Sequence, residues 1–381
     1  MPTQFDPTQR LVVAMSGGVD SSAVAWMLRR AGHPLVGLFM RNGVHVDAAE
    51  VHKKSCCSLG DARDARMIAA ALDIPFQAVD LAEEFGDIIA YFTSEYSRGR
   101  TPNPCAVCNR DLKMGRLLEF ADELGAAGVA TGHYARLALV DGRVRLRRGV
   151  DARKDQSYQL FSVAEAHLAR TALPLGGMQK PEVRALAREA GLRTSQKRDS
   201  QEVCFIPSND YRRLLAERGV ELHPGDIVDT LGRKVGEHVG TEHYTIGQRR
   251  GIKVATGRPL YVVATVPEEG LVIVGDRVEC GATAMRVEDL NWIGFDAPRA
   301  FRCVVQHRYH CVPAPATVTL AQGGADVAFD APELAVAPGQ GAAFYDGDLL
   351  LGGGWIERVE RVGPGGSQAG AARAEDVASG A

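Results

Sequence analysis

The strongest chemical signal in the chain is the loop Ser-Gly-Gly-Val-Asp-Ser-Ser at residues 16–22, between an apolar run and an amphipathic run. Two adjacent glycines let backbone N–H groups approach a phosphate closely, and a helix beginning directly after them turns its positive end toward the anion. The hydroxyls of Ser16, Ser21 and Ser22 add donors, and the carboxylate of Asp20 could hold Mg²⁺ beside the phosphates. No Gly-Lys-Ser/Thr follows, so this is not a Walker A motif. The pattern predicts a phosphate-binding loop, with a capped Gly-Gly turn as the plainer alternative.

Three of the eight cysteines stand in contexts that suit sulfur chemistry. Cys105 and Cys108 lie in a proline-rich segment, and Cys204 lies in a polar segment far along the chain. Asn109 is expected to cap the next helix, and a thiol just before a helix N-terminus, with basic residues close behind, should have a lowered pKa. Such a thiolate could attack a persulfide carried by a second cysteine and leave a disulfide.

Two other interpretations of the cysteines stay open. The Cys-x-x-Cys pair at 105–108 could be half of a zinc site, although no second pair completes it. Each thiol could also be a small buried hydrophobic side chain, which we favour for Cys280, Cys303 and Cys311. The adjacent Cys56 and Cys57 stay undecided, with the buried interpretation favoured.

The first half of the chain alternates between expected strands and expected helices. The strands are expected at residues 11–15, 35–40, 76–81 and 128–131, and the helices at 22–31, 61–72, 84–96 and 110–124. This alternation predicts an α/β fold with a parallel sheet covered by helices on both faces. Met40, at the end of the second strand, lies where an adenine could rest in a doubly wound sheet, unless it is a core methionine.

The second half changes character after two further expected helices at 180–190 and 211–218. From residue 224 to about 360, short β-type runs alternate with Gly, Asp and Pro turns, which predicts a small β-rich domain followed by a β-barrel. We expect domains at residues 1–207, 208–279 and 280–362, followed by a disordered Gly/Ala/Ser-rich tail at 363–381.

The composition is that of an ordinary folded protein: 381 residues, 45% hydrophobic and 24% charged, with a formal net charge of −3. Slight acidity argues against a protein that coats nucleic acid, but basic runs at 143–148 and 249–253 could contact RNA phosphates or be solvated faces. No apolar run approaches the roughly 20 residues of a membrane helix, and the N-terminus has no signal pattern. We therefore expect a cytoplasmic protein without a membrane partner.

Further motifs accompany the loop and the cysteines. They are Gly-Arg-Thr-Pro-Asn-Pro at 99–104, Cys-Asn at 108–109, Ala-Thr-Gly-His-Tyr at 130–134, Lys-Asp-Gln-Ser-Tyr at 154–158, Asp-Ser-Gln-Glu-Val-Cys-Phe at 199–205 and Tyr-Thr-Ile-Gly-Gln-Arg-Arg-Gly at 244–251. Together with the loop, which resembles that of the ATP pyrophosphatases, these motifs resemble the bacterial MnmA family of tRNA-specific 2-thiouridylases. The resemblance runs from about residue 10 to residue 360.

This resemblance implies an adenine-nucleotide α-hydrolase-like sheet, a small central domain and a C-terminal β-barrel. It also implies that ATP and Mg²⁺ bind the loop, and that C2 of the wobble uridine in the tRNAs for Lys, Glu and Gln is adenylated and then thiolated. The implied nucleophile is Cys108, and the implied persulfide carrier is Cys204. The residues that match ATP contacts of the family are Ala14, Met15, Ser16, Gly17, Gly18, Val19, Asp20, Ser21, Met40 and Gly132.

The resemblance also implies contacts with the RNA. The segment that matches contacts with the target base is Asn103, Pro104 and Cys105. The residues that match other tRNA contacts are His133, Lys154, Asp155, Gln156, Arg308, Tyr309 and Gln340. Because a lone histidine is more often structural, we expect His133 to bind and not to act as a general base.

One position departs from the family pattern, because some members carry Asp where this chain has Cys105. The thiols of Cys105, Cys108 and Cys204 could therefore hold a [4Fe-4S] cluster, as in related tRNA thiolases, which is the alternative to the persulfide route. The expected sulfur donor is a cysteine desulfurase or a sulfur-relay protein, and the family implies a monomer. An amide-forming ATP pyrophosphatase and an RNA-binding module, with ATP as a switch or with structural zinc, are the alternative functions.

Overall fold

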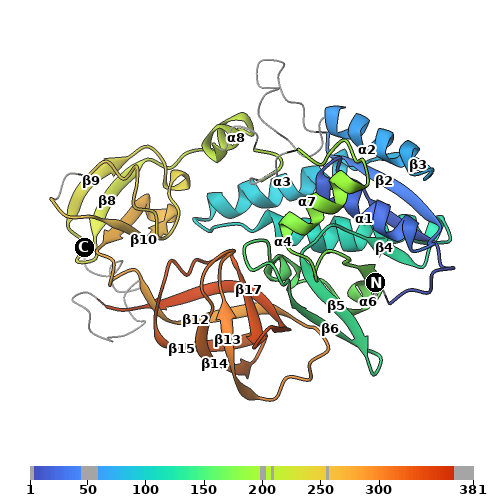
Figure 1. Cartoon of the computed structure of the whole chain (residues 1–381). Helices are drawn as coiled ribbons and strands as arrows, with labels where there is room; N and C mark the ends of the chain where they lie inside the picture. The colour runs from blue at the N-terminus through green and yellow to red at the C-terminus, as the bar shows by residue number, and fades with distance from the viewer. Residues whose placement is uncertain (1–3, 44–58, 198–202, 207–209, 255–256, 364–381) are drawn as a thin grey trace.

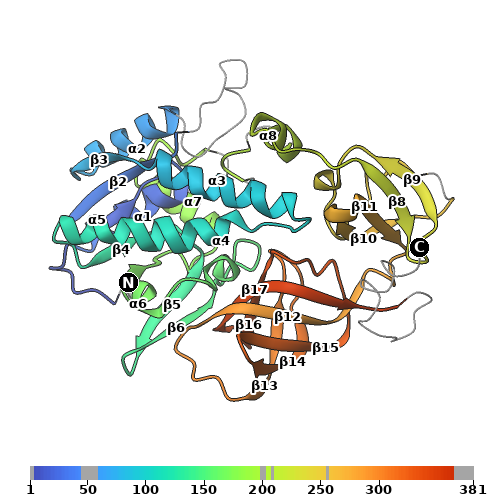
Figure 2. The same cartoon turned by 180° about the vertical axis from the view of Figure 1, so that it is seen from behind.

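The computed structural model describes residues 4–43, 59–197, 203–206, 210–254 and 257–363. They form three bodies: a helix-covered sheet in blue to green, a small β domain in yellow, and a β-barrel in orange to red (Figure 1, and from behind in Figure 2). Cys56, Cys57 and the tail from residue 364 onward lie outside the described residues.

The first body is built on a parallel sheet of five strands in the order β3-β2-β1-β4-β7. The strands are β1 (Leu11–Ala14), β2 (Leu35–Arg41), β3 (Phe76–Asp80), β4 (Gly128–Ala130) and β7 (Thr171–Ala172). The order reverses between β1 and β4, and the carboxyl ends of strands at such a switch point are where ligands of this fold class bind.

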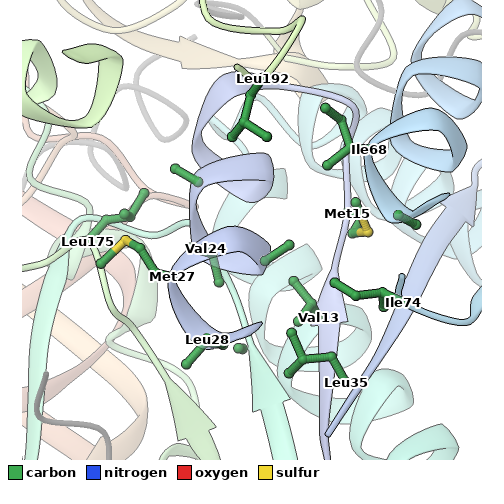
Figure 3. Close-up of a cluster of buried hydrophobic side chains, with 14 of the residues drawn as sticks. Val13, Met15, Val24, Met27, Leu28, Leu35, Ile68, Ile74, Leu175 and Leu192 are labelled. Carbon is green, nitrogen blue, oxygen red and sulfur yellow. The ribbon is translucent and has the colours of Figure 1, made fainter. Parts of the chain in front are cut away.

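Apolar side chains of β1 point alternately to the two faces of this sheet, as the pleat of a strand requires. Val13 packs with α1, α2 and α7 in the cluster drawn in Figure 3, to which Val24, Met27 and Leu28 of α1 also belong, with Met27 beside Leu175. Val12 packs on the opposite face with α5. The predicted parallel sheet with helices on both faces is therefore confirmed.

Eight α-helices are described. They are α1 (Val19–Arg30), α2 (Leu59–Ala71), α3 (Ala82–Ser97), α4 (Pro104–Cys108), α5 (Leu117–Glu123), α6 (Glu165–Ala169), α7 (Lys180–Glu189) and α8 (Tyr211–Glu217). A π-helix, η2 (Asn109–Arg116), joins α4 to α5, so the single helix expected over 110–124 is in fact two segments of different winding. Short 3₁₀ turns are η3 (Ser157–Leu160), η4 (Thr241–His243) and η5 (Pro267–Glu269). None of these helices is both long and apolar enough to cross a bilayer.

The small domain and the barrel confirm the predicted β-rich second half. The small domain has the strand order β10-β11-β8-β9, with β8 (Gly225–Asp229), β9 (Lys234–His238), β10 (Tyr261–Val266) and β11 (Leu271–Gly275). The barrel strands are β12 (Gly281–Trp292), β13 (Ala300–Gln306), β14 (Ala314–Ala321), β15 (Gly324–Leu334), β16 (Gly341–Asp346) and β17 (Leu349–Arg361). It is antiparallel and closes because β12 pairs with both β15 and β17.

A hairpin from the first body extends the barrel sheet. It consists of β5 (Ala135–Val140) and β6 (Arg143–Arg148), and β6 pairs with Leu349 and Leu350 at the start of β17. Arginines of its basic run form ion pairs with carboxylates of this protein: Arg143 pairs with Asp296 at 3.1 Å, and Arg148 pairs with Asp155 at 3.0 Å. These ion pairs hold the hairpin against the rest of the protein, so both arginines have partners in the absence of nucleic acid.

Candidate active site

The predicted phosphate loop forms a tight turn against α2. Gly17 has φ +67°, and a Cβ there would lie 2.2 Å from the backbone oxygen of Asp61. Gly18 is the N-cap residue of α1, so the first N–H groups of the helix open onto the loop. Inside the turn, the backbone N–H of Ser16 donates to Ser21 Oγ at 3.1 Å. The loop therefore has the geometry of an anion site at a helix N-terminus.

The other residues predicted to contact ATP frame this loop. Ala14 ends β1, whereas Met15 and Val19 are buried in the core, so their backbone and not their side chains can face a ligand. Met40 lies half-buried near the end of β2, on the face of the sheet that packs against α5. The structure thus brings these residues together at the carboxyl ends of the first two strands.

Asp20 forms an ion pair with a lysine that was not among the predicted site residues. Lys180 Nζ donates to both carboxylate oxygens of Asp20, at 2.8 and 2.7 Å, and Tyr134 Oη donates to Oδ1 at 2.8 Å. Lys180 is only 7% exposed. The first residue of a helix is electrostatically unfavourable for a cation, so a lysine at the start of α7 was a signal of a tertiary partner.

The arrangement around Asp20 does not fit a magnesium site. Mg²⁺ takes carboxylate oxygens at about 2 Å in a nearly ideal octahedron. Both oxygens of Asp20 already accept hydrogen bonds from an ammonium group, which would repel a divalent cation. In this arrangement the carboxylate of Asp20 serves Lys180 and not the predicted Mg²⁺.

A second lysine fastens the other side of the loop. Lys197 Nζ donates to the backbone oxygen of Gly17 at 2.8 Å and to Asp64 at 2.8 Å, and it also pairs with Asp61. The carboxylates of α2 therefore orient a cation that holds the turn in place. The sequence prediction missed Lys197, because nothing local distinguishes it from a surface lysine.

The cysteine segment is positioned by Asn103, and this corrects the predicted start of the helix. Asn103 Oδ1 accepts from the backbone N–H of Ala106 at 3.2 Å, and Pro104 occupies the first turn of α4. The prediction that Asn109 caps the helix is wrong, because α4 already begins after Asn103 and continues directly into the π-helix η2 at Asn109, so Cys108 lies within a continuous helical segment. The helix dipole is therefore no reason for a lowered pKa at Cys108.

The structure brings Cys108 and Cys204 to one apolar cluster. Both are half-buried and pack against a cluster that includes Phe85, Phe92 and Phe205, whereas Cys105 is exposed. None of the three thiols is in a disulfide. Among the described residues, which include all three, no group of three Cys, His, Asp or Glu side chains is arranged to hold a metal ion. This geometry does not provide a ready-made cluster site.

The turn after β4 links the phosphate loop to the cysteine segment. A Cβ on Gly132 would lie 3.1 Å from the Cβ of Asp20, so this turn packs directly against the loop. The next residue, His133, reaches the other way: its Nε2 lies 3.1 Å from Oδ1 of Asn109, the neighbour of Cys108. The two predicted centres therefore share one rigid turn.

His133 lies inside this connection and not on the surface. It is 6% exposed, and its Nδ1 lies 2.8 Å from Thr131 Oγ1. Asn109 Nδ2 donates to a backbone oxygen at 3.0 Å, so Asn109 Oδ1 is the acceptor and His133 Nε2 carries the proton. Burial, aided by nearby Lys113, lowers the pKa of His133 well below its ordinary value of 6.5. His133 is thus neutral and orients the residue after Cys108.

The buried neutral state of His133 predicts a loss of stability in mild acid. Below about pH 6.5 the unfolded chain binds a proton at this position and the folded chain does not, so the free energy of unfolding falls as the pH falls, by up to about 1.4 kcal/mol per pH unit. Urea midpoints at pH 7.5 and 5.5 should show a smaller drop for His133→Gln than for the wild type. An equal drop in both would contradict this account.

Gln340 connects the barrel to the cysteine segment. Its Nε2 donates to the backbone oxygens of Thr101 and Pro102, at 3.1 and 2.8 Å, and the side chain is buried. These two residues directly precede Asn103. Gln340 therefore holds the segment that is predicted to contact the target base. The sequence also predicts that Gln340 contacts the tRNA, which stays a prediction.

Replacing Gln340 by alanine should loosen the cysteine segment. Two buried carbonyl groups lose their donor, and a displacement of about 1 Å in a catalytic segment can cost up to about a hundredfold in rate. We expect faster amide hydrogen exchange over residues 99–109 and a roughly tenfold lower kcat for the Gln340→Ala variant. Gln322→Ala, on an exposed turn of the barrel, is the matched control. Unchanged exchange together with a raised KM for tRNA would show that Gln340 serves only as an RNA contact.

The remaining predicted tRNA residues gather where the hairpin, the first body and the barrel meet. Asp155 accepts from Arg148 and from Ser157 Oγ, at 3.0 Å each, and Gln156 Oε1 accepts from the backbone of the turn after β4 at 3.1 Å. Tyr309 stacks on Tyr158, with ring centroids 6.3 Å apart. Lys154 and Arg308 directly precede Asp155 and Tyr309 in the sequence. Their contacts with RNA stay predictions.

The three cysteines predicted to be inert lie in or beside the barrel. Burial raises the pKa of Cys280 to about 11 and that of Cys303 to about 12, and it also raises the pKa of Cys311. A thiol with a raised pKa is a poor nucleophile at neutral pH. These values agree with a packing role.

Comparison with known families covers nearly the whole described chain. A model described as the tRNA methyl transferase HUP domain matches residues 9–208, and its PRC-barrel domain matches residues 213–276. A model described as the aminomethyltransferase beta-barrel domain matches residues 282–356. The three models agree with the three bodies of the structure.

Individual relatives are similar over nearly their full length. A protein from Geobacter metallireducens, described as tRNA-specific 2-thiouridylase MnmA, is 48% identical over 362 residues, which cover 93% of this chain and 98% of that protein. A protein of the same description from Geotalea uraniireducens is 46% identical, covering 92% and 96%. Among solved structures, the U34-tRNA thiolase NcsA from Methanococcus maripaludis with its [4Fe-4S] cluster is 18% identical with a TM-score of 0.33, covering 56% of this chain and 67% of that one.

Proposed function

Because the chain belongs to the MnmA family of tRNA-specific 2-thiouridylases, we propose that it uses ATP to replace the C2 oxygen of the wobble uridine in the tRNAs for Lys, Glu and Gln with sulfur. The observation that carries this proposal is the turn after β4. Through Gly132 it packs against the phosphate loop, and through His133 it contacts Asn109 beside Cys108. Activation by ATP and attack by sulfur at one carbon require such neighbouring centres.

The first step activates the base. A carbonyl oxygen of uracil is a poor leaving group, so its attack on the α-phosphorus of ATP converts it into an adenylate, with pyrophosphate as the product. The N–H groups at the start of α1 and the loop hydroxyls stabilise the charge that develops on the departing phosphates. We propose that Mg²⁺ arrives with the ATP phosphates and keeps several of its waters, as it does in many nucleotide sites.

The second step delivers sulfur. In the proposed route Cys204 carries a persulfide, and the thiolate of Cys108 attacks Cys204 Sγ, which forms a disulfide and releases hydrosulfide. Hydrosulfide then attacks C2, and AMP leaves with the former C2 oxygen. If the persulfide instead attacks C2 directly, Cys108 afterwards breaks the S–S bond and the same disulfide results. A dithiol reductant supplies the two electrons that restore both thiols.

The alternative cofactor is a [4Fe-4S] cluster on Cys105, Cys108 and Cys204. It would require the three thiols to come together from the arrangement described here. We favour the persulfide route because Cys108 and Cys204 share one apolar cluster, whereas Cys105 is exposed.

The remaining parts of the chain are proposed to hold the tRNA and the sulfur source. Catalysis belongs to residues 1–207, and the barrel at 280–362 contacts the RNA together with the junction around Asp155 and Tyr309. The wobble base must leave its stack to expose C2, which costs a few kcal/mol. We further propose a monomer that receives sulfur from a cysteine desulfurase or a relay protein.

The test combines purified protein, unmodified tRNA for Glu, ATP, Mg²⁺, a reductant and a sulfur source. Thiolated product migrates more slowly in a gel that contains an organomercurial. We expect a shift that requires ATP and is lost when the wobble uridine is replaced by cytidine. AMP formation without tRNA dependence and without a shift would instead support an amide-forming ATP pyrophosphatase.

A further inference from the structure

The ion pair between Lys180 and Asp20 raises an electrostatic question about the phosphate loop. Asp20 lies in the first turn of α1, at the end of the helix that would receive a triphosphate. A carboxylate there stabilises the empty helix but repels a bound polyanion, because both compete for the same positive end. A site for ATP therefore needs the charge of Asp20 to be compensated.

We propose that Lys180 is a positioning residue for ATP binding, whose ammonium cancels the charge of Asp20 and leaves the N-terminus of α1 open to the phosphates. The geometry supports this role. Lys180 Nζ lies 2.7 and 2.8 Å from the two carboxylate oxygens, and the lysine side chain is buried, whereas the Asp20 side chain is 31% exposed, so solvent screens the pair only in part. Tyr134 Oη, at 2.8 Å from Oδ1, fixes the rotamer of the carboxylate.

The position of Lys180 at the start of α7 supports the same role. Its backbone N–H donates to Asp151 Oδ2 at 2.9 Å, and Gln179 and Glu182 form a capping box around it. The helix start is therefore held independently of the side chain. The fixed backbone at the start of α7 therefore places the ammonium beside the phosphate loop. A positive charge at the N-terminus of α7 does not stabilise that helix, so the stabilising partner of the ammonium is Asp20.

The experiment measures binding of the α,β-methylene analogue of ATP by calorimetry, without tRNA. The Lys180→Met variant should bind the analogue about tenfold to hundredfold more weakly than the wild type. The Lys180→Arg variant should bind nearly as well as the wild type. Adding Asp20→Asn to Lys180→Met should restore most of the lost affinity, because the charge to be compensated is then gone. Arg188→Gln, on the exposed side of the same helix, should have no effect.

Two results would overturn the proposal. If Asp20→Asn does not rescue Lys180→Met, the lysine acts on the phosphates directly. If Lys180→Met binds like the wild type, the ion pair is structural. If the Lys180→Met variant does not fold, the Asp20→Asn single variant provides the test. In EDTA, this variant should bind the analogue as tightly as the wild type or more tightly. Weaker binding than the wild type would contradict the proposal. The proposal rests on the proposed use of the loop for ATP, which fails separately if the wild type does not bind the analogue.

Discussion

Replacing either Cys108 or Cys204 by serine is expected to abolish thiolation of tRNA, with a loss of at least about a thousandfold in rate. A hydroxyl cannot carry a persulfide and cannot attack one, so neither protein can complete the sulfur exchange. Activation by ATP uses the loop and not the thiols. Both variants should therefore still release pyrophosphate in the presence of tRNA, for at least one turnover.

The control for this experiment is Cys105→Ser. Cys105 lies three residues before Cys108 in the same short helix but is exposed, and the persulfide route does not use it. We expect this variant to keep most of its activity. A loss as large as that of the other two variants would show that all three thiols act together, which is the behaviour of a cluster and not of a persulfide pair.

The second large effect is expected for Gly17→Ala. The backbone at Gly17 has φ +67°, and the added Cβ would lie 2.2 Å from the backbone oxygen of Asp61, so the loop must move away from α2. Binding of ATP to the loop depends on its backbone N–H groups, so we expect tRNA-dependent pyrophosphate release to fall by at least about a hundredfold.

A matched glycine separates this effect from general destabilisation. Gly177 has no positive φ, and a Cβ there would meet open space, so Gly177→Ala should retain full activity. Melting temperatures of both variants should be measured alongside the rates. A Gly17→Ala protein with wild-type rates would mean that ATP is not held by this turn.

The architecture was largely predictable because it depends on local patterns. Buried strands such as β1 are short apolar runs, and α1 carries apolar residues at helical spacing directly after the Gly-Gly turn. The β5–β6 hairpin was missed, because its alternating arginines resemble a solvated face, and their partners, such as Asp296 and Asp348, are distant in sequence.

The candidate site was predictable only where its chemistry is local. The phosphate loop and the thiols of Cys108 and Cys204 carry their signal in neighbouring residues. The helix cap at Asn109 was predicted wrongly, because Asn103 and Pro104 start the helix one turn earlier and the π-helix continues it past Cys108. The ion pair of Asp20 with Lys180 depends on tertiary packing, and its local signal, a lysine at the first position of α7, does not identify the partner.

The most direct test of the account follows sulfur from the protein to the RNA. The protein is first loaded with ³⁵S by a cysteine desulfurase and [³⁵S]cysteine, and then separated from the donor. It is next mixed with ATP, Mg²⁺ and unmodified tRNA for Glu in a single turnover. We expect up to one ³⁵S per protein to move into 2-thiouridine, only with ATP, and none from the Cys204→Ser protein. Transfer that persists in Cys204→Ser, or that occurs only after reconstitution with iron and sulfide, would contradict the persulfide route.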